Sequence, residues 1–193
     1  MLPNTDRKKD AAPYTSVIRA LAAAPPEGNT MSDLSTLAAE TFASYYEEVR
    51  DHVHKLVAPL STGDLWRNPY SYGNSIGHLL LHLTGNLNHY IGAQIAGTGY
   101  VRNRPLEFTD ASRPAKEEVL VAFDRAIDMV ASTIRKQSPG DWAAPYSDST
   151  SPRDRTRFSA IQRMAAHASH HVGQMIYLAK ELASTQQGAS APR

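Results

Sequence analysis

Apolar side chains recur every three or four residues in four separate stretches of the chain. These stretches cover residues 33–60, 75–96, 114–137 and 157–182. The period predicts amphipathic α-helices with one apolar face each. In the last stretch, the steps from Phe158 to Leu182 alternate between three and four residues, as in a heptad seam. No stretch alternates like a strand, so we expect an all-α fold, a four-helix bundle.

Two long links separate the predicted helices. The link over 97–113 is long enough to return along a whole helix, since about seventeen extended residues reach about 50 Å and a helix of about 22 residues is only about 33 Å long. That length allows the helices before and after it to run parallel, although an ordinary loop fits the sequence as well. The link over 138–156 holds Trp142 and Tyr146, which predict a packed lid.

Composition limits the size and the partners of the protein. The 193 residues (21.1 kDa) suit one domain over 31–183, with flexible tails over 1–30 and 184–193. A net charge of +1 predicts neither nucleic acid nor an anionic membrane as a partner. The sequence has no cysteine, which excludes disulfides, thiolate metal sites and a cysteine nucleophile. No apolar run is long enough to span a membrane. Residues 6–10 mix both signs of charge, unlike a secretion signal, so we expect a cytoplasmic protein.

Histidine is unusually common and clustered. Six of the eight histidines lie in two predicted helices, at His78, His82, His89, His167, His170 and His171. Histidines four residues apart face the same way, about 6 Å apart at Cβ, so that both can bind one ion. This spacing occurs at 78/82 and at 167/171, beside the apolar face of each helix, and does not choose between His78 and His82. We interpret His52, His54, His89 and His170 as structural rather than ligating.

Two motifs resemble those of a known superfamily. Residues 74–86 (NSIGHLLLHLTGN) resemble the second-helix signature of the DinB-like (DinB/YfiT) superfamily. Residues 167–175 (HASHHVGQM) resemble its fourth-helix motif, H-x-x-x-H-x-G-Q. The resemblance spans about residues 34–182 and implies an up-down-down-up bundle, with a long crossover between the helices over 75–96 and 114–137.

The resemblance also implies a divalent metal ion held by three histidines. Carried onto this chain, the ligands are His82, His167 and His171. His78 stands where such proteins usually carry an ordinary residue, and would be an additional ligand or a group behind the ligands. Imidazole suits zinc and nickel best here, with iron or manganese as alternatives.

Other residues of the two motifs have physical interpretations. Gly85 and Gly173 would let the helices approach closely. Asn86 and Gln174 can hydrogen-bond to an imidazole or to a metal-bound water. The candidates for a general base near the site are Tyr90, Tyr146 and Asp148.

Three functions fit these features. The first, implied by the resemblance, is a metal-dependent transferase that activates a low-molecular-weight thiol, such as bacillithiol or mycothiol, against an electrophile. The second is a non-catalytic, stress-related metal-binding bundle or dimerisation module. The third is a metal-free helical scaffold, in which the histidine pairs would point apart. Spare apolar residues on the helices over 33–60 and 157–182 predict a homodimer.

Overall fold

The computed structural model describes residues 31–109, 111–146 and 155–189. In these residues the regular structure is helical, apart from an isolated bridge between Pro145 and Thr156. The long helices are α2 (Met31–Val57), α4 (Ile76–Leu87), α6 (Lys116–Arg135) and α8 (Arg157–Ala189). The short elements are α3 (Thr62–Trp66), the π-helical turn η1 (Asn88–Ala93), α5 (Leu106–Thr109) and α7 (Pro139–Ala143). The expected all-α fold is therefore confirmed.

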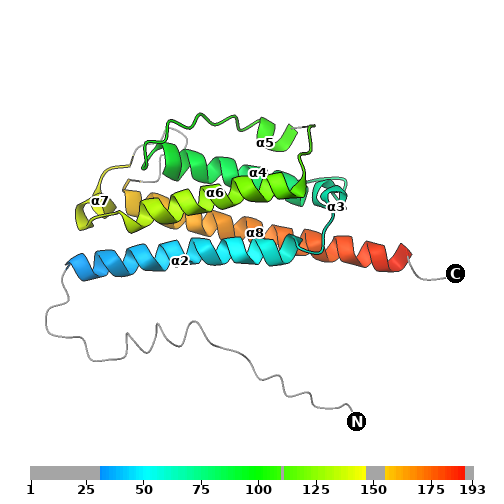
Figure 1. Ribbon diagram of the computed structural model, residues 1–193, viewed down its shortest axis with the longest axis horizontal. Helices are drawn as coiled ribbons and strands as arrows, with labels where there is room; N and C mark the ends of the chain where they lie inside the picture. Colours follow the sequence, from blue (N-terminus) through cyan, green and yellow to red (C-terminus); the bar gives the residue numbers. More distant parts are fainter. Residues whose placement is uncertain (1–30, 110, 147–154, 190–193) are drawn as a thin grey trace, which may run out of the picture.

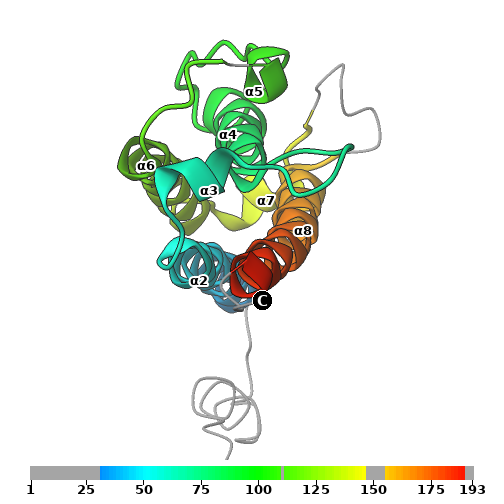
Figure 2. The ribbon, with the colours of Figure 1, turned by 90° about the vertical axis from the view of Figure 1, so that its right-hand side faces the viewer.

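The four long helices lie side by side. In Figure 1, α2 and α8 run from left to right, whereas α4 and α6 run in the opposite sense. Seen end-on in Figure 2, they occupy four corners, and the packed pairs are α2 with α6, α2 with α8, α4 with α6 and α4 with α8. The link after η1 returns along α4 to α5 (Figure 1), as its length allowed.

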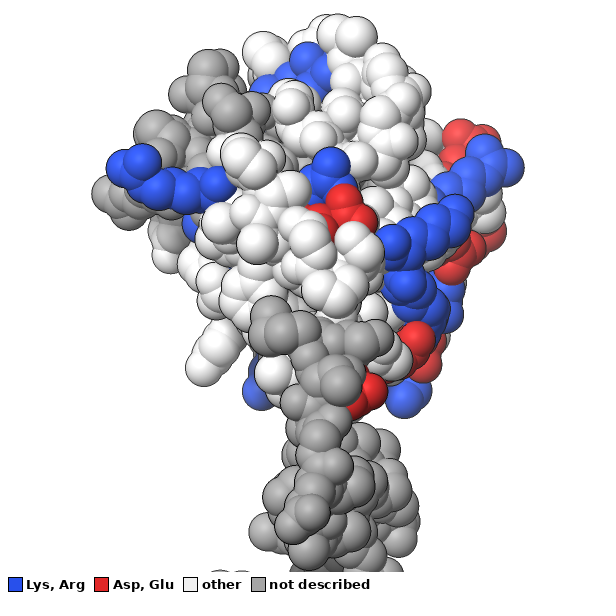
Figure 3. All heavy atoms as spheres, turned by 90° about the vertical axis from the view of Figure 1, so that its left-hand side faces the viewer, with Lys and Arg blue, Asp and Glu red and all other residues white. Residues whose placement is uncertain are grey.

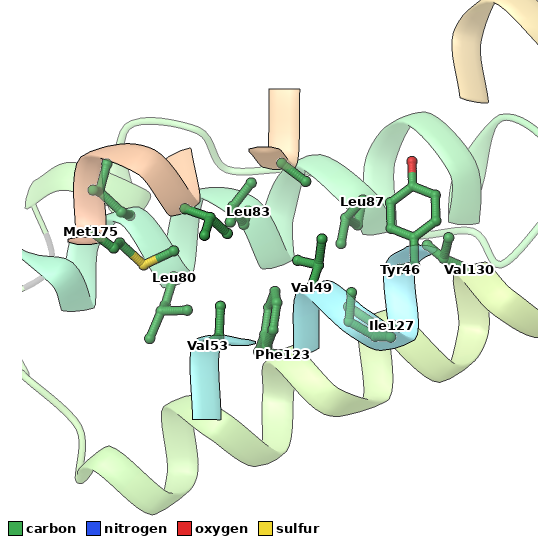
Figure 4. Packing of buried hydrophobic residues seen from close by; sticks show 14 of the residues in the cluster. Tyr46, Val49, Val53, Leu80, Leu83, Leu87, Phe123, Ile127, Val130 and Met175 are labelled. Carbon is green, nitrogen blue, oxygen red and sulfur yellow. The ribbon is translucent and has the colours of Figure 1, made fainter. Parts of the chain in front are cut away.

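The core is built from the inner faces of all four helices. Large side chains from α2, α4, α6 and α8 meet there (Figure 4), among them Tyr46, Leu83, Phe123 and Met175. Tyr46 is fully buried, and its hydroxyl donates a hydrogen bond to the Ile161 carbonyl oxygen at 3.1 Å. Most of the predicted α8 seam is buried, namely Ile161, Ala165, Ala168, Val172, Met175 and Leu182.

The prediction of the buried face of α2 was wrong at the start of the helix. Leu34 and Leu37 are 51% and 42% exposed. The indole N–H of the buried Trp142 donates to Ser35 Oγ at 3.0 Å, and this bond turns Ser35 inward. The first turns of α2 therefore present Ser35 and Ala39 to the protein, and the neighbouring leucines to water. The seam residue Phe158 is likewise 45% exposed.

The 138–156 link and the C-terminal end of α8 differ in how far they follow the sequence-based predictions. Trp142 and Tyr146 are buried, so the described part of the 138–156 link packs as predicted. Helix α8 continues past its predicted end to Ala189, so residues 184–189 of the predicted C-terminal tail are helical instead. The hydroxyls of Ser184 and Thr185 donate to the Glu181 carbonyl oxygen one turn earlier. The tail expected over 1–30 lies outside the described residues, as do 190–193. Among the described helices, none has the length and hydropathy needed to span a bilayer.

Candidate metal centre

Three histidines converge between α4 and α8. His82 projects from α4, and His167 and His171 project from successive turns of α8. The Nε2 atom of His167 lies 3.4 Å from Nε2 of His82 and 3.0 Å from Nε2 of His171. One potential ligand atom from each residue lies within 4.8 Å of the others. The structure therefore brings together the three residues that the sequence motifs indicated, in a group that could hold a metal ion.

Hydrogen bonds fix the orientation of two of these rings. His82 Nδ1 lies 2.7 Å from Glu107 Oε2, and His171 Nδ1 lies 2.7 Å from Gln174 Oε1. A carboxylate or amide oxygen accepts, so each Nδ1 carries the hydrogen and each Nε2 keeps its lone pair for the centre. Acceptors of this kind behind a histidine orient it as a metal ligand.

Two of the three rings, those of His167 and His171, favour the neutral form that binds metals. Burial, with the neighbouring histidines and Arg102, lowers the pKa of His167 to about 3. Burial also lowers the pKa of His171, against the opposing effect of its bond to Gln174. The Nε2 atoms of His82 and His171 lie 3.4 and 3.0 Å from Nε2 of His167. A cation between them would be coordinated by three Nε2 atoms, so the donor set fits a divalent ion with three imidazole ligands.

Glu107 and Arg102 support the site from the link that follows α4. The guanidinium of Arg102 donates to the Glu107 carboxylate through Nε at 2.6 Å and through Nη2 at 2.8 Å. Burial acts to raise the pKa of Glu107, but the hydrogen bonds from His82 and Arg102 and the charge of Arg102 hold it below its usual range. Glu107 is only 6% exposed, and these partners keep its carboxylate ionised although it is buried. A buried carboxylate needs such partners.

Sequence reasoning missed both Glu107 and Arg102. They lie in the link over 97–113, whose only helix among the described residues is the single turn α5, too short for helical periodicity to carry information. The available signal was that a buried histidine needs an acceptor, while the link back along the helix contains only two acidic residues, Glu107 and Asp110. Nothing local distinguishes these two.

We had expected the two motif glycines, Gly85 and Gly173, to let the helices approach closely, and the structure shows otherwise. A Cβ on Gly85 would collide with the Glu107 carboxylate, so this glycine makes room for the acceptor of His82. A Cβ on Gly173 would meet no atom within 4 Å, so nothing packs closely there.

The supporting residues predicted from the motifs have different outcomes. Gln174 bonds to an imidazole, as expected. His78 is outside the histidine group, because its Nδ1 lies 2.8 Å from Ser75 Oγ in a capping box at the start of α4. Asn86 is buried, and its Oδ1 has no hydrogen-bond partner among the described residues.

The two described candidates for a general base, Tyr90 and Tyr146, make contacts with the link and with Arg102. The Tyr146 hydroxyl donates to the Tyr90 carbonyl oxygen at 3.1 Å, a bond that ties the 138–156 link to η1. The ring of Tyr90 lies under the Arg102 guanidinium, with 5.8 Å from Cζ to the ring centroid. Asp148 lies outside the described residues.

Comparison with known proteins places the chain in a family without assigning an activity. A family model described as "Protein of unknown function (DUF1572)" matches residues 33–191. No curated protein matches the chain. The match includes all three converging histidines and both supporting residues of the link. The chain belongs to the DUF1572 family.

Proposed function

We propose that this protein is a divalent-metal-dependent enzyme of the DinB-like superfamily, a transferase that activates a low-molecular-weight thiol. The observation that carries the proposal is the convergence of three imidazoles on one point, with Glu107 and Gln174 orienting two of them. The antiparallel and parallel directions of the long helices (Figure 1) support an up-down-down-up bundle as the frame of the site.

The residues that would hold the ion are His82, His167 and His171. Three protein ligands leave coordination positions open, as in catalytic rather than structural sites. A divalent ion held by neutral ligands lowers the pKa of a bound thiol, which supplies thiolate at neutral pH. Zinc or nickel suits this donor set.

The other residues of the site position the ligands. Glu107 accepts the Nδ1 hydrogen of His82 and so orients that ring, and Arg102 donates to Glu107 through Nε and Nη2. Gln174 holds His171 in the same manner. A cavity lined in part by His170 and Gln174 lies next to the residue that holds His171 and offers space for a second substrate.

The test combines metal content, stability and turnover. Elemental analysis of the purified protein should find about one zinc or nickel per chain. A screen of small thiols against a fluorogenic electrophile, monochlorobimane, should find turnover that His171→Ala abolishes, while the variant stays folded because the α8 seam is intact.

A structural metal gives a different pattern. An ion at a thousandfold excess over its Kd contributes about 4 kcal/mol, which corresponds to a melting shift of about 8–16 °C for a domain of this size. A large, chelator-sensitive melting shift with no turnover on any thiol would overturn the enzyme proposal.

A further inference from the structure

A cavity of about 480 Å³ lies between the loop before α4 and the second half of α8. This cavity, which we call the tyrosine pocket, is lined by Tyr70, Tyr72, Gly73, Asn74, Leu79, His170, Gly173, Gln174, Tyr177 and Leu178. Its volume falls in the range of about 300–1,000 Å³ that is usual for small-molecule sites. The size therefore suits a small organic ligand.

The loop that forms one wall has a defined shape. Asn68 Nδ2 donates to the carbonyl oxygens of Tyr72 and Gly73 at 2.9 and 3.0 Å, and Asn68 Oδ1 accepts from the Tyr70 N–H at 3.1 Å. Gly73 has a φ of +79°, which a residue with a side chain rarely adopts. These features hold the wall in place before a ligand binds, which lowers the entropic cost of binding.

The chemistry of the walls selects an uncharged ligand with a flat apolar body. The rings of Tyr70 and Tyr72 stack with centroids 5.5 Å apart and an interplanar angle of 15°. Tyr72 and Tyr177 are 74% and 71% exposed, which leaves two aromatic faces in water. Among the described residues, the lining contains no Lys, Arg, Asp or Glu, and its polar groups are three tyrosine hydroxyls and the side chains of Asn74, His170 and Gln174. Aromatic faces stack on flat rings, and the lining lacks a carboxylate, ammonium or guanidinium group that would pair with a charged ligand.

Gly173 keeps the pocket open. It lies in the interior of α8, where glycine costs about 0.5–1 kcal/mol relative to alanine. No close packing explains it, because an added Cβ would meet nothing within 4 Å. Since Gly173 lines the pocket, any larger side chain there would enter the free space.

The pocket adjoins the histidine group through two lining residues that contact His171. Gln174 lines the pocket and bonds to His171 Nδ1 at 2.7 Å. The ring of His170, also in the lining, lies 5.1 Å from the ring of His171 between centroids. A ligand in the pocket is therefore one side chain away from a candidate metal ligand.

We propose that the tyrosine pocket binds an uncharged, flat, apolar molecule, and that this molecule is the electrophile of the transfer reaction. The assignment as electrophile rests on the proposed function. In the transfer, the thiolate sulfur forms a bond to the electrophilic carbon, the leaving group departs with the bonding electron pair, and the thiol proton passes to solvent. An aryl halide is the simplest substrate of this class.

Binding is tested with the full chain and two matched probes. N-phenyl-1-naphthylamine is uncharged and has a flat naphthalene ring system, and 1-anilinonaphthalene-8-sulfonate carries a negatively charged sulfonate on the same framework. The uncharged probe should give saturable fluorescence enhancement with about one site per chain and bind at least about tenfold more tightly than the sulfonate. Chelator should leave this binding unchanged, because no metal ligand lines the pocket.

Variants locate the site. Gly173→Leu should weaken binding of the uncharged probe at least tenfold, and Tyr72→Ser should weaken it severalfold. Gly140→Leu, on the exposed turn α7 outside the pocket, is the matched control and should bind like wild type. Tyr72→Ser changes an exposed side chain, so it keeps the test valid if Gly173→Leu does not fold.

Three results would overturn the proposal. The first is unchanged binding of the uncharged probe in both pocket variants, and the second is equal or tighter binding of the sulfonate. The third is conversion of a dimer into a monomer by Gly173→Leu, which would make the pocket an interface between copies of the chain. Turnover of 1-chloro-2,4-dinitrobenzene with a small thiol should show a KM raised at least about tenfold in Gly173→Leu, with kcat less affected. Probe binding without turnover on any electrophile would contradict the proposed function and leave the pocket as a ligand site.

Discussion

The carboxylate of Glu107 occupies the space that a Cβ on Gly85 would need. Gly85 is buried within α4, one turn after His82, and Glu107 reaches it from α5 across the end of the returning link. The missing side chain thus lets an acidic residue from a distant part of the sequence contact the histidine. The bond from His82 Nδ1 to Glu107 Oε2, at 2.7 Å, depends on this space.

Gly85→Ala should displace Glu107 and weaken metal binding. Loss of a carboxylate behind a metal ligand typically lowers affinity by about 10–100-fold. The clash should also lower the free energy of unfolding by about 1–3 kcal/mol, although alanine is the better helix former by about 1 kcal/mol. Competition with a chromophoric chelator and urea denaturation measure the two effects.

Gly173→Ala is the matched control for this substitution. Its new Cβ meets nothing within 4 Å, so the gain in helix propensity should raise stability by about 0.5–1 kcal/mol. If Gly85→Ala is stabilised to the same extent and binds metal like wild type, Glu107 does not need the space beside Gly85.

Substitutions of His78 and His82 should have separate effects, although the two residues share one helical spacing. His78→Ala removes half of the Ser75 capping box and should cost about 0.5–2 kcal/mol of stability, with metal affinity within about twofold of wild type. His82→Ala removes one of the three converging nitrogens and should lower metal affinity by orders of magnitude. Thermal melts and metal titrations of both variants check this, and a large loss of affinity in His78→Ala would make His78 a ligand.

The free energy of unfolding should fall above pH 10, because the buried Tyr46 hydroxyl keeps its proton in the folded state and loses it in the unfolded chain. Burial, with a smaller contribution from Tyr45, raises the pKa of Tyr46 far above its usual value. The unfolded chain loses this proton near pH 10, whereas the folded chain keeps it. Because the folded state then binds more protons, each pH unit above 10 lowers the free energy of unfolding by up to about 1.4 kcal/mol.

Tyr46→Phe isolates this contribution. At pH 7 the variant should be less stable by about 1 kcal/mol, because the hydrogen bond to the Ile161 carbonyl oxygen is lost. Above pH 10 its stability should decline less steeply than that of wild type, so the difference narrows and then reverses. Urea denaturation at pH 7, 10 and 11 measures both slopes, and parallel slopes would assign the alkaline loss to other groups.

A homodimer should form through the end of the molecule that carries α7. Figure 3 shows that large parts of the visible surface at this end carry no charged side chains. Leu34 and Phe158 are about half exposed there and line a hollow of about 210 Å³. Light scattering at micromolar concentration should give twice the 21.1 kDa chain mass, and Phe158→Glu should reduce it. Particles of 21.1 kDa alone in wild type would contradict the prediction.

Much of the helical structure was predictable because helix periodicity is local. The spacing of apolar residues predicted four long helices near their observed bounds, and the buried α8 seam from Ile161 to Leu182 followed from steps of three and four. The pairing of His167 with His171 was equally predictable, since residues one turn apart on a helix share a face. Which side of the first turns of α2 faces the protein was not predictable, because it depends on the bond between Trp142 and Ser35, residues far apart in the sequence.

The sequence by itself determined the all-α class, the long helices and the two histidine spacings, all of which depend on residues within one or two helical turns. Residue spacing alone left His78 and His82 equivalent, and only the motif resemblance favoured His82. The tertiary structure placed His82 against α8 and left His78 at a helix cap. It also decided that Glu107 supports the site and that Gly173 opens a pocket. These outcomes depend on the path of a long link and on the packing of two helices, which bring together residues whose local patterns carry no information about one another.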